Sequence, residues 1–571
     1  MYWLQSHCKL LLFCSHSLLN ACDSAIFNAQ LLICPKGAYH VKKFRAGNRN
    51  SASAAPTITS IFSFGSTVAI ALALTLLIAA GGQVVQAGAP PALPVASALP
   101  LVSAAPLAQL DRFRNSLYDD TLGQGYRFDR GGWIYVHLQG TPHDIGVQHG
   151  YLLAPQIADA YGVIRLELTH DTGRDWGFFR RAAQEMLWPK IDAEYQQELQ
   201  GIVAGLNDHG VKLDLWDVVA MNAFCELPDY YVPWLDKQTN AGNQPNLAPQ
   251  GHCSAFVATG SWTKDGQIVM AHSNWTSYIE GTRWRIIFDI VPQNGYRILM
   301  DGFPGVITSD DDFGVNSAGL MVTETTISNF HGWNPNGIPE FERSRKALQY
   351  ASSIDQYVQI MVDGDNGGYA NDWLLGDRKT GEIARFELGL KHWKVWRTKD
   401  GYFSGSNFPS DADVIRDETS FDPNNPASSP NARRIRWHTL LNENKGKIDT
   451  ALAEAFLGDH YDTYEKKIDP DSRTLCGHGD TQPSTLPGST SPPFNPYGAV
   501  SGKVMNSQMA ATMSFIARIG HPGGMNFSAA KFLDAHPEFS WEAPVLEDMD
   551  AGPWTVFRIG DHASQQSLVT K

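Results

Sequence analysis

Cysteine is scarce in this chain, and charge is absent from a long stretch near its N-terminus. Only seven of the 571 residues are cysteine, and no Lys, Arg, Asp or Glu lies between Arg49 and Asp111. A basic stripe is also lacking. The net charge is −14, and because the first 50 residues hold six basic side chains and one acidic side chain, the remainder carries −19. Such an acidic body repels phosphate backbones, so nucleic acid is not an expected partner.

The uncharged stretch predicts an export signal. An apolar run at 68–80 follows the basic N-terminal residues, and small residues at 85–89 match the pattern of a signal peptidase site. The 22 residues at 61–82 hold no charge, which is also long enough for a retained membrane anchor. We therefore assign 1–60 to an extension, either an overcalled start or a targeting segment, and 61–89 to a signal peptide or anchor. The expected location is secreted, periplasmic or a lysosome-like lumen, or membrane-anchored if the signal is not cleaved.

The periodicity of the remaining chain changes near its middle. Between 90 and 252 it is largely helical: "TPHDIGVQHGYLLAPQIADAYGVIRLEL" and "WGFFRRAAQEMLWPKIDAEYQQELQGIVAGLNDHG" follow a strand-like "GGWIYVHLQG". From 253 to 571 short strand-like segments alternate with turn residues. Eight strands are predicted, namely "SAFVATG", "QIVMAHSNW", "RWRIIFDIV", "YRILMDGF", "GLMVTETT", "DWLLGD", "EIARFELG" and "HWKVWRTK". Helices in one block and antiparallel strands in another predict an α+β fold, with two sheets stacked under helices.

Three cysteines follow the predicted signal: Cys225, Cys253 and Cys476. Cysteines of an exported protein can pair in an oxidising compartment, and an odd number leaves one thiol free. Cys225 and Cys476 either form a disulfide, or Cys476 is simply buried. In the first case Cys253 is left as the free thiol.

The surroundings of Cys253 favour a reactive thiol, although a buried strand cysteine usually acts as a small apolar side chain. Gly251-His252 precede it and allow an exposed, bent approach, and Ser254-Ala255 leave room beside the sulfur. A hairpin through the following Lys-Asp-Gly turn pairs residues whose numbers sum to about 528. His272 and Asn274 are therefore predicted near the end of the sheet that Cys253 occupies.

Several motifs in a fixed order resemble one protein family. They are Cys-Ser-Ala, His-x-Asn-Trp and "DGFPGVITSDDDFGVNSAGLMVTETTI", preceded by "GTPHDIGVQHGYLLAPQI" and followed by "GSNF", "NPYGAVSGKVMN" and "FSW". Together they resemble the phospholipase B-like proteins, which belong to the N-terminal-nucleophile (Ntn) hydrolases, close to the penicillin acyltransferase type of cysteine hydrolase. The resemblance extends from about residue 130 to about residue 550. The gap between Cys253 and His272 is slightly longer than expected for the phospholipase B-like proteins, and the Cys476-Gly-His-Gly segment lies closer to the penicillin acyltransferase side. Both departures bear on the substrate.

The resemblance implies a four-layer αββα Ntn-hydrolase sandwich of two antiparallel sheets between helices, and a precursor that cuts itself. Cleavage between His252 and Cys253 would separate a propiece or small chain, 90–252, from a catalytic chain, 253–571. The new α-amine of Cys253, whose ordinary pKa is about 7.7–8, would act as the base for its own thiol. The implied reaction is attack on an ester or amide carbonyl, a thioester acyl-enzyme, and hydrolysis by water. Neither a metal nor a cofactor is expected.

Three further residues are implied as catalytic partners. His272 would position the Cys253 amine or the substrate carbonyl, and the alternative is a hydrogen-bonded strand histidine. Asn274 would supply an amide N–H to the oxyanion or to the amine, although Asn274-Trp275-Thr276 is also a glycosylation sequon. Asn407, in Gly-Ser-Asn-Phe, is the candidate oxyanion donor, and otherwise a loop-capping residue.

Other residues are assigned to the substrate or to the frame of the site. Thr325 and Thr326 would line the cleft by resemblance, and Trp275 is one of several aromatic side chains that suit either a cleft or a core. Asp310–Asp312 suggest a metal cluster, but adjacent carboxylates in a turn usually face water, so no metal site is expected there. One of three neighbouring arginines would anchor the surroundings of the nucleophile: Arg433, Arg434 or Arg436.

We therefore expect an exported hydrolase of acyl ester or amide bonds, with lipid deacylation favoured over cleavage of an N-acyl small molecule. Transient contact with a membrane surface suits such a substrate. The two chains are expected to stay associated, because strands that begin at Cys253 need the earlier helices for cover. The alternatives are a penicillin acyltransferase-like amidase or acyltransferase, and a non-catalytic lipid-binding relative. A serine esterase is disfavoured because no Gly-x-Ser-x-Gly motif occurs.

Overall fold

The computed structural model describes residues 115–239 and 253–565. The predicted extension and signal, 1–60 and 61–89, lie outside the described residues, and so does His252 of the expected cleavage site. Cys253 is described. In the two described ranges, no helix combines the length and the apolar character that crossing a membrane would require.

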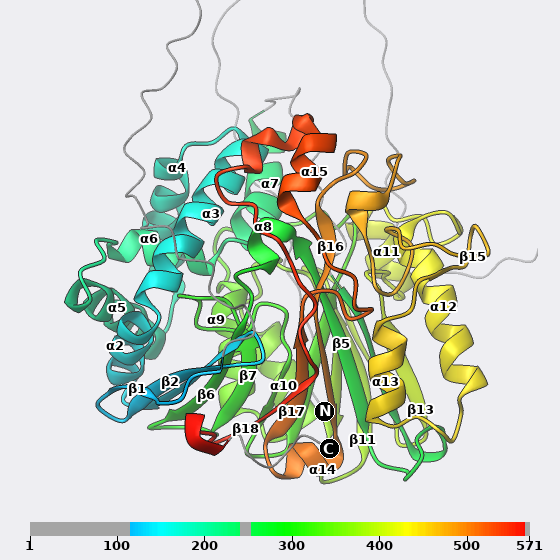
Figure 1. Ribbon diagram of the computed structural model, residues 1–571, viewed down its shortest axis with the longest axis horizontal. Helices are drawn as coiled ribbons and strands as arrows, with labels where there is room; N and C mark the ends of the chain where they lie inside the picture. The colour runs from blue at the N-terminus through cyan, green and yellow to red at the C-terminus, as the bar shows by residue number, and fades with distance from the viewer. Residues whose placement is uncertain (1–114, 240–252, 566–571) are drawn as a thin grey trace, which may run out of the picture. The chain divides into compact units, whose positions relative to one another are not determined.

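Ten strands in the described part of the chain form one sheet, drawn from both sides of Cys253 (Figure 1). In spatial order they are β1 (Asp120–Leu122), β2 (Gly125–Arg130), β3 (Trp133–Gly140), β6 (Ile286–Pro292), β7 (Ile298–Gly302), β8 (Gly314–Asn316), β9 (Leu320–Thr326), β10 (Asn371–Asp377), β11 (Glu382–Leu388) and β12 (Trp393–Thr398). Neighbours are antiparallel except β3 and β6, which run parallel. The sheet that we predicted to be antiparallel thus holds one parallel pair, because the long connection from β3 to β6 brings the chain back in the same direction.

Six more strands form a second, antiparallel sheet. Their spatial order is β13 (Gly401–Gly405), β4 (Cys253–Thr259), β5 (Val269–Ser277), β16 (Tyr497–Asn506), β17 (Ser514–Ile519) and β18 (Thr555–Arg558). Both β4 and β5 have a neighbour on each side, so Cys253 begins an interior strand. An interior position fixes the backbone of the predicted nucleophile more firmly than an edge strand would.

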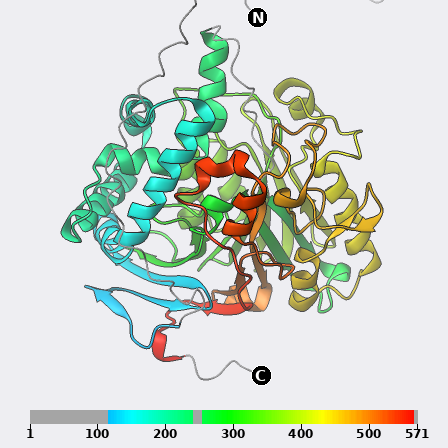
Figure 2. The same cartoon turned by 45° about the horizontal axis from the view of Figure 1, so that its top comes forward.

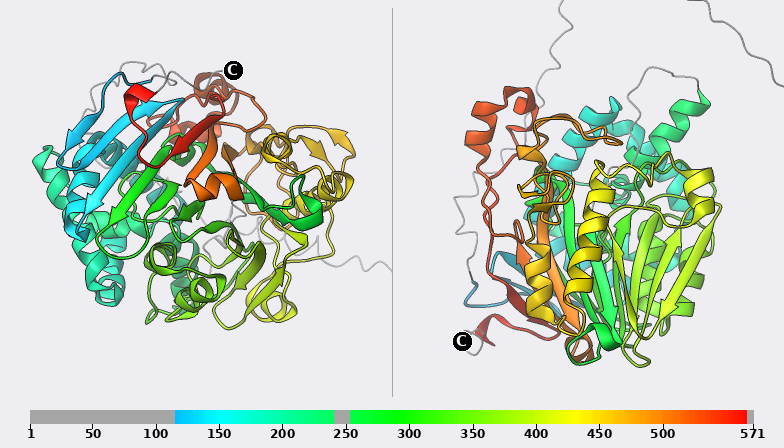
Figure 3. Two further views of the ribbon diagram at one scale, coloured as in Figure 1. Left: turned by 90° about the horizontal axis from the view of Figure 1, so that it is seen from below. Right: turned by 90° about the vertical axis from the view of Figure 1, so that its right-hand side faces the viewer.

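Alternate side chains of β4 enter two different cores, as the period of two in a strand requires. Ala255 and Val257 pack into a core that also holds side chains of β6, β7 and β9, so this core lies between the two sheets. Phe256 and Ala258 pack on the other face against α12 (Ser429–Glu443) and α13 (Thr450–Leu457). Figure 3 shows these two helices alongside the strands.

Helices that precede and helices that follow Cys253 in the sequence cover the large sheet on the face away from β4. These are α2 (Pro142–Leu152), α3 (Ala154–Thr172), α4 (Trp176–Ala182), α5 (Ala193–Asp208), α6 (Leu215–Asn222), α7 (Val232–Gln238), α9 (Glu340–Tyr350) and α10 (Ile354–Val362). Another small core joins α8 (Tyr278–Gly281) to α15 (Ala529–Ala535), which belongs to the orange-red helical segments near the centre of Figure 2. The remaining helices are short: α11 (Ala412–Glu418) and α14 (Ser507–Ala511).

The predicted elements are confirmed in type, with two differences. Each of the eight predicted strands after Cys253 corresponds to a strand, and "GGWIYVHLQG" corresponds to β3. The second helical stretch is divided between α4 and α5 by a 3₁₀ turn at Trp188–Lys190, because Pro189 lacks the N–H that a continuous helix needs. The first stretch begins at Thr141 with a capping box to Asp144, and divides after Leu152.

Candidate active site

The β4–β5 hairpin brings the predicted nucleophile and its partners to one face of the small sheet. Cys253 lies opposite Asn274, and Ala255 lies opposite His272. The register differs by one position from the predicted one. Since Ala255 faces the core between the sheets, the side chains of Cys253, His272 and Asn274 share that face. All three are buried, and Asn274 between two strands is not accessible as a glycosylation site.

Asn407 and Arg433 hold the backbone of Cys253 on both sides of its Cα. The Cys253 N–H donates to Oδ1 of Asn407 at 3.4 Å, and Arg433 donates to the Cys253 carbonyl at 2.6 Å. Arg433 also donates to Oδ1 of Asn407 at 2.8 Å. Of the three candidate arginines, Arg433 is therefore the one in the site; Arg434 contacts Pro423 and Arg436 pairs with Asp459.

The amide of Asn407 is oriented by β9. Its Nδ2 donates to the carbonyl of Thr326 at 2.8 Å, so the oxygen faces Cys253 and the nitrogen faces away. This corrects the prediction that Asn407 offers an amide N–H to an oxyanion, because the donor is directed at the backbone of the other sheet. A φ of 68° places Asn407 in the left-handed region, which asparagine tolerates better than most residues. Its position suits a role in holding the nitrogen of Cys253.

The sulfur of Cys253 contacts Asn274 and also Glu324, a residue that was not among the predicted site residues. Sγ is 3.4 Å from Oε1 of Glu324 and 4.0 Å from Oδ1 of Asn274. Burial raises the pKa of the Cys253 thiol well above its usual value, with Glu324 adding to the effect. Burial likewise raises the pKa of Glu324 well above its usual range. The thiol is therefore the dominant form of Cys253 near neutrality, and burial favours the neutral form of Glu324. The Glu-Thr-Thr sequence contained Glu324, but only its distance from Sγ identifies it.

Asn274 carries the donor that is free. Its Nδ2 is buried and has no hydrogen-bond partner within the described residues. An unpaired buried amide N–H is costly unless a partner arrives, so this atom is placed to receive an oxygen. Asn407 thus holds the nitrogen of Cys253, and the predicted amide N–H of Asn274 is the donor left unpaired next to the site.

His272 is a neutral imidazole next to a buried ion cluster. Burial, and then the ammonium of Lys503, lower the pKa of His272 to about 3. Its Nδ1 lies 3.8 Å from Oδ2 of Asp311, and neither ring nitrogen has a hydrogen-bond partner among the described residues. The alternative of a hydrogen-bonded strand histidine is therefore not observed. A donor atom of this ring lies within 4.8 Å of both the Cys253 sulfur and a Glu324 oxygen.

The three adjacent aspartates do not face water, which corrects the prediction from the turn pattern. Asp310–Asp312 are at most 6% exposed. Lys503 pairs with Asp311 and, at 2.7 Å, with Asp301, while Asp312 accepts from Trp373 Nε1 at 2.7 Å. The ammonium of Lys503 on β16 compensates the central carboxylate, Asp311, and this contact is nearly 200 positions distant in sequence.

A cavity of about 420 Å³ opens beside Asn274 and Trp275. Trp275 also borders a smaller cavity of about 70 Å³, and the Arg433 guanidinium stacks 4.2 Å over its ring. Trp275 therefore lies where a substrate-contacting residue was predicted. Thr325 and Thr326 are fully buried and are not among the described residues that line either cavity; Thr325 packs on Gly405 instead.

The polar lining of the larger cavity is acidic. Its carboxyl groups come from separate segments: Glu167, Asp171, Asp229, Glu280, Glu538 and Glu542. Lysine and arginine are absent from the lining that the structure describes. Burial raises the pKa of Glu542 to about 8, and the pKa of Glu167 is raised well above its usual value by the same cause. This lining disfavours an anionic group at depth and accepts neutral or cationic ones.

The three described cysteines are all free, so the predicted alternative of a Cys225–Cys476 disulfide is excluded. Cys476 is buried, as the other alternative expected. Donor atoms of Cys253, His272 and Glu324 lie within 4.8 Å of one another, which is close enough to surround a metal ion. The nearby ammonium of Lys503 opposes a cation there, since it already lowers the pKa of His272. We therefore interpret this trio as part of the nucleophile site.

Comparison with known proteins finds similarity to the phospholipase B-like proteins. A family model described as Phospholipase B matches residues 177–389, which hold Cys253, Asn274 and Glu324. The chain is 26% identical over 416 residues to the putative phospholipase B-like 1 of Caenorhabditis elegans, covering 65% of this chain and 69% of that protein. It is 24% identical over 267 residues to phospholipase B-like 1 of Bos taurus, covering 41% and 48%. It is 32% identical over 143 residues to phospholipase B-like protein F of Dictyostelium discoideum, covering 23% and 25%. The last two matches span less than half of the relatives' own length. The chain is therefore similar to the phospholipase B-like proteins over a large part of its described length.

Proposed function

We propose that this protein is an exported hydrolase of acyl ester or amide bonds in which Cys253 is an N-terminal nucleophile. The observation that carries the proposal is the clamp of Asn407 and Arg433 on the backbone of Cys253. A strand residue that serves only as a core side chain needs no side-chain bonds to its N–H and carbonyl, whereas a nucleophile that uses its own nitrogen as base needs that nitrogen held in place.

The proposed first step is cleavage between His252 and Cys253. The thiol attacks the carbonyl carbon of His252, and the Cys253 nitrogen leaves as an amine, which forms a thioester. Water then hydrolyses the thioester, leaving a carboxylate on His252 and a free thiol and α-amine on Cys253. In the uncut chain the thiol has a raised pKa, so it attacks mainly through its small thiolate fraction.

In turnover the free amine takes the thiol proton while the sulfur attacks the acyl carbonyl. The negative charge that develops on the carbonyl oxygen would be received by Nδ2 of Asn274, which is buried and unpaired before substrate arrives. The ammonium returns its proton to the departing alcohol or amine, and a thioester remains. The amine then takes a proton from water, which attacks the thioester carbonyl. The C–S bond breaks, the acid is released, and the ammonium returns its proton to the Cys253 sulfur. Asn407 orients the amine throughout through its side-chain oxygen.

The acidic cavity beside Asn274 is the proposed substrate site. Its volume of about 420 Å³ suits a small-molecule substrate or one end of a lipid. Aromatic side chains would take apolar parts, and the carboxyl groups favour a neutral or cationic polar group over an anionic one. Lipid esters agree with the names of the relatives, and transient contact with a membrane surface suits them. An N-acyl amine of the kind used by penicillin acyltransferase-like enzymes is the second candidate, because its amine end fits the acidic lining.

The remaining proposals concern architecture and location. Two sheets that share one core, each with helices on its outer face, support the αββα sandwich of Ntn hydrolases. β3 pairs with β6 across the proposed cut, which supports two chains that remain associated. The apolar run at 68–80, within the uncharged stretch 61–82, supports export by a cleaved signal or an anchor.

The test combines N-terminal sequencing with two Cys253 variants. Purified active protein should yield a chain that begins at Cys253. Cys253→Ala should remain uncut and hydrolyse neither phospholipid nor N-acyl amine substrates, while Cys253→Ser, which keeps a nucleophile, should be cut more slowly. Fully active protein that is still joined at residue 252 would overturn the proposal. Wild-type protein that is cut and binds lipid vesicles without hydrolysing any acyl substrate would instead support the non-catalytic alternative.

A further inference from the structure

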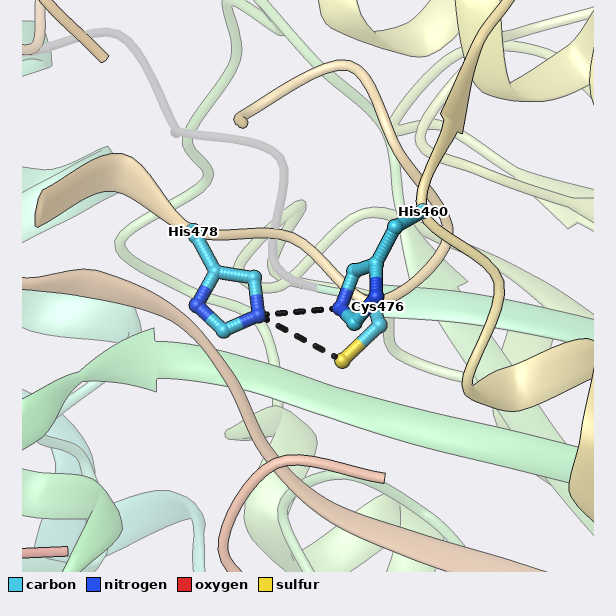
Figure 4. Close-up of side chains that lie close together, drawn as sticks. All are labelled: His460, Cys476 and His478. Atoms are coloured by element: carbon cyan, nitrogen blue, oxygen red, sulfur yellow. Dashed lines mark hydrogen bonds between the residues drawn. The ribbon is translucent and has the colours of Figure 1, made fainter. Parts of the chain in front are cut away.

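Three potential metal ligands converge away from Cys253, on the outer side of β5 and β16. His460 follows α13, and Cys476 and His478 belong to the loop before β16 (Figure 4). The Nε2 atoms of His460 and His478 are 3.1 Å apart, and Sγ of Cys476 is 3.7 Å from Nε2 of His478. The three donor atoms all lie within 4.8 Å of one another.

These distances are those of a tetrahedral zinc site. Zinc–nitrogen bonds of about 2.0–2.1 Å and a zinc–sulfur bond of about 2.3 Å give edges of about 3.3 Å between two nitrogens and about 3.6 Å between nitrogen and sulfur. The observed 3.1 Å and 3.7 Å lie within a few tenths of an ångström of those edges. In Figure 4 both rings direct a nitrogen toward the space that the sulfur also faces.

Neighbouring groups stabilise and orient the ligands on the side away from the proposed ion. Cys476 and His478 are 0% and 1% exposed, and His460 is partly buried. The N–H of Gly523 donates to Sγ of Cys476 at 3.3 Å, a contact that stabilises a thiolate. Nδ1 of His478 lies 3.8 Å from Oδ1 of Asp480, on the side of the ring away from the other ligands. A carboxylate behind a metal-binding histidine is the usual way to orient the ring.

We propose that His460, Cys476 and His478 bind a single Zn²⁺ ion. On binding, the Cys476 thiol releases its proton to solvent and the two imidazoles donate their neutral nitrogen lone pairs, so the bound ion retains one net positive charge. Water takes the fourth position. A thiolate with two imidazoles is a donor set that zinc prefers over the hard cations Mg²⁺ and Ca²⁺.

The ion would fix one wall of the nucleophile site. Gly477 lies between the two loop ligands, and a Cβ there would come within 2.0 Å of the Trp275 ring. Cys476 and Trp275 share a small core with Ala499. Because Trp275 borders both cavities and stacks with Arg433, zinc would hold this wall from the side away from substrate. The zinc site does not depend on the proposed reaction.

The test is metal binding by the full chain, kept reduced, with Zn²⁺ or Co²⁺ as the only ligand added. Elemental analysis after dialysis should give one zinc per chain. Co²⁺ should produce the visible bands of a tetrahedral site and a near-ultraviolet band from thiolate-to-cobalt charge transfer. Wild-type protein that retains neither metal would overturn the proposal, and this measurement requires no variant that could fail to fold.

Matched variants assign the ligands. Cys476→Ser should abolish the charge-transfer band and His478→Gln should lower zinc retention at least tenfold. Cys225→Ser and His438→Gln, which change a free cysteine and an exposed histidine elsewhere, should retain one zinc per chain. Equal zinc content in Cys476→Ser, His478→Gln and wild type would show that the imidazoles and thiol form only a hydrogen-bonded cluster, and would overturn the assignment.

Discussion

At the scale of single residues, the two asparagines next to Cys253 differ in whether the amide nitrogen is already paired. The Asn407 oxygen accepts from the Cys253 N–H and its nitrogen donates to Thr326, whereas Asn274 has its oxygen 4.0 Å from Sγ and a buried Nδ2 without a partner among the described residues. Their substitutions should therefore have different kinetic signatures, although both residues are buried amides within reach of one cysteine.

Asn274→Ala should lower kcat by about 10²–10³ with little change in KM, because an oxyanion donor acts mainly in the transition state. Steady-state kinetics on protein that mass spectrometry shows to be cut at residue 253 would measure this. A higher KM with unchanged kcat in Asn274→Ala would mean that this amide binds the ground-state substrate.

Asn407→Ala should instead move the pH limb of kcat/KM to lower pH, since an accepting oxygen stabilises the ammonium form of the amine.

The candidate site was predictable where its residues are close in sequence. Cys253, His272 and Asn274 lie on one hairpin, and strand alternation with a short turn fixes their relation to within one position. Glu324, Arg433 and Lys503 come from other elements, and no local pattern places a side chain opposite another that is 70 to 250 positions away. The inward turn of Asp310–Asp312 escaped prediction for this reason, because its cation lies on β16.

At the scale of elements, α2 and α5 pack through glycines on both helices. Gly146 and Gly150 of α2 face Gly201 and Gly205 of α5. A Cβ on Gly150 would come within 2.1 Å of the carbonyl oxygen of Ile202, which is backbone and cannot rotate away. The spacing of four residues in GVQHG and in GIVAG was the sequence signal for this contact, since residues four apart share a helix face.

Gly150→Ala should lower the free energy of unfolding by about 1–3 kcal/mol, because α2 and α5 must separate to admit the methyl group. Gly162→Ala in α3 is the matched control: a Cβ there meets nothing within 4 Å, so higher helix propensity should raise stability by about 0.5–1 kcal/mol. Urea unfolding followed by circular dichroism measures both changes. Equal effects of the two substitutions would contradict the close approach of the helices.

Element type was more predictable than element pairing. Strands with clear alternation were found from the sequence, but the joining of β3 to β6 in parallel depends on how helices α2–α7 return the chain, and no pattern within either strand encodes it. The short strand β13, "GYFSG", was also missed, because two glycines and a serine weaken its strand signal. It nevertheless carries the chain into Asn407.

At the scale of the whole molecule, the segments on the two sides of Cys253 form one folded unit. β1–β3 extend the large sheet, and α2–α6 share its core with β6, β7 and β9. The same packing buries acidic groups in a chain that already carries a net charge of −14. Its stability should therefore depend on pH through buried carboxyl groups more than through surface ion pairs.

Glu542 offers the clearest measurement of that dependence. It is 3% exposed, its Oε2 has no hydrogen-bond partner among the described residues, and burial followed by the charge of Asp171 raises its pKa to about 8. A glutamate whose pKa is higher in the folded protein than in the unfolded chain favours folding at low pH. The folded state therefore loses stability as pH rises from about 4.3, the unfolded value, towards about 8, at about 1.4 kcal/mol for each pKa unit of the difference.

Glu542→Gln should remove this contribution, so the difference in melting temperature between variant and wild type should grow in favour of the variant from pH 5 to about pH 8 and then stay constant. Differential scanning calorimetry across this range measures the difference directly, and comparison of two curves cancels the general effect of rising negative charge. Glu538→Gln, which removes an exposed carboxylate four positions earlier, controls for the loss of one charge near the same cavity. A constant difference between Glu542→Gln and wild type would mean that Glu542 is already ionised at pH 5, and a cation or a donor would then have to lie opposite its unpaired oxygen.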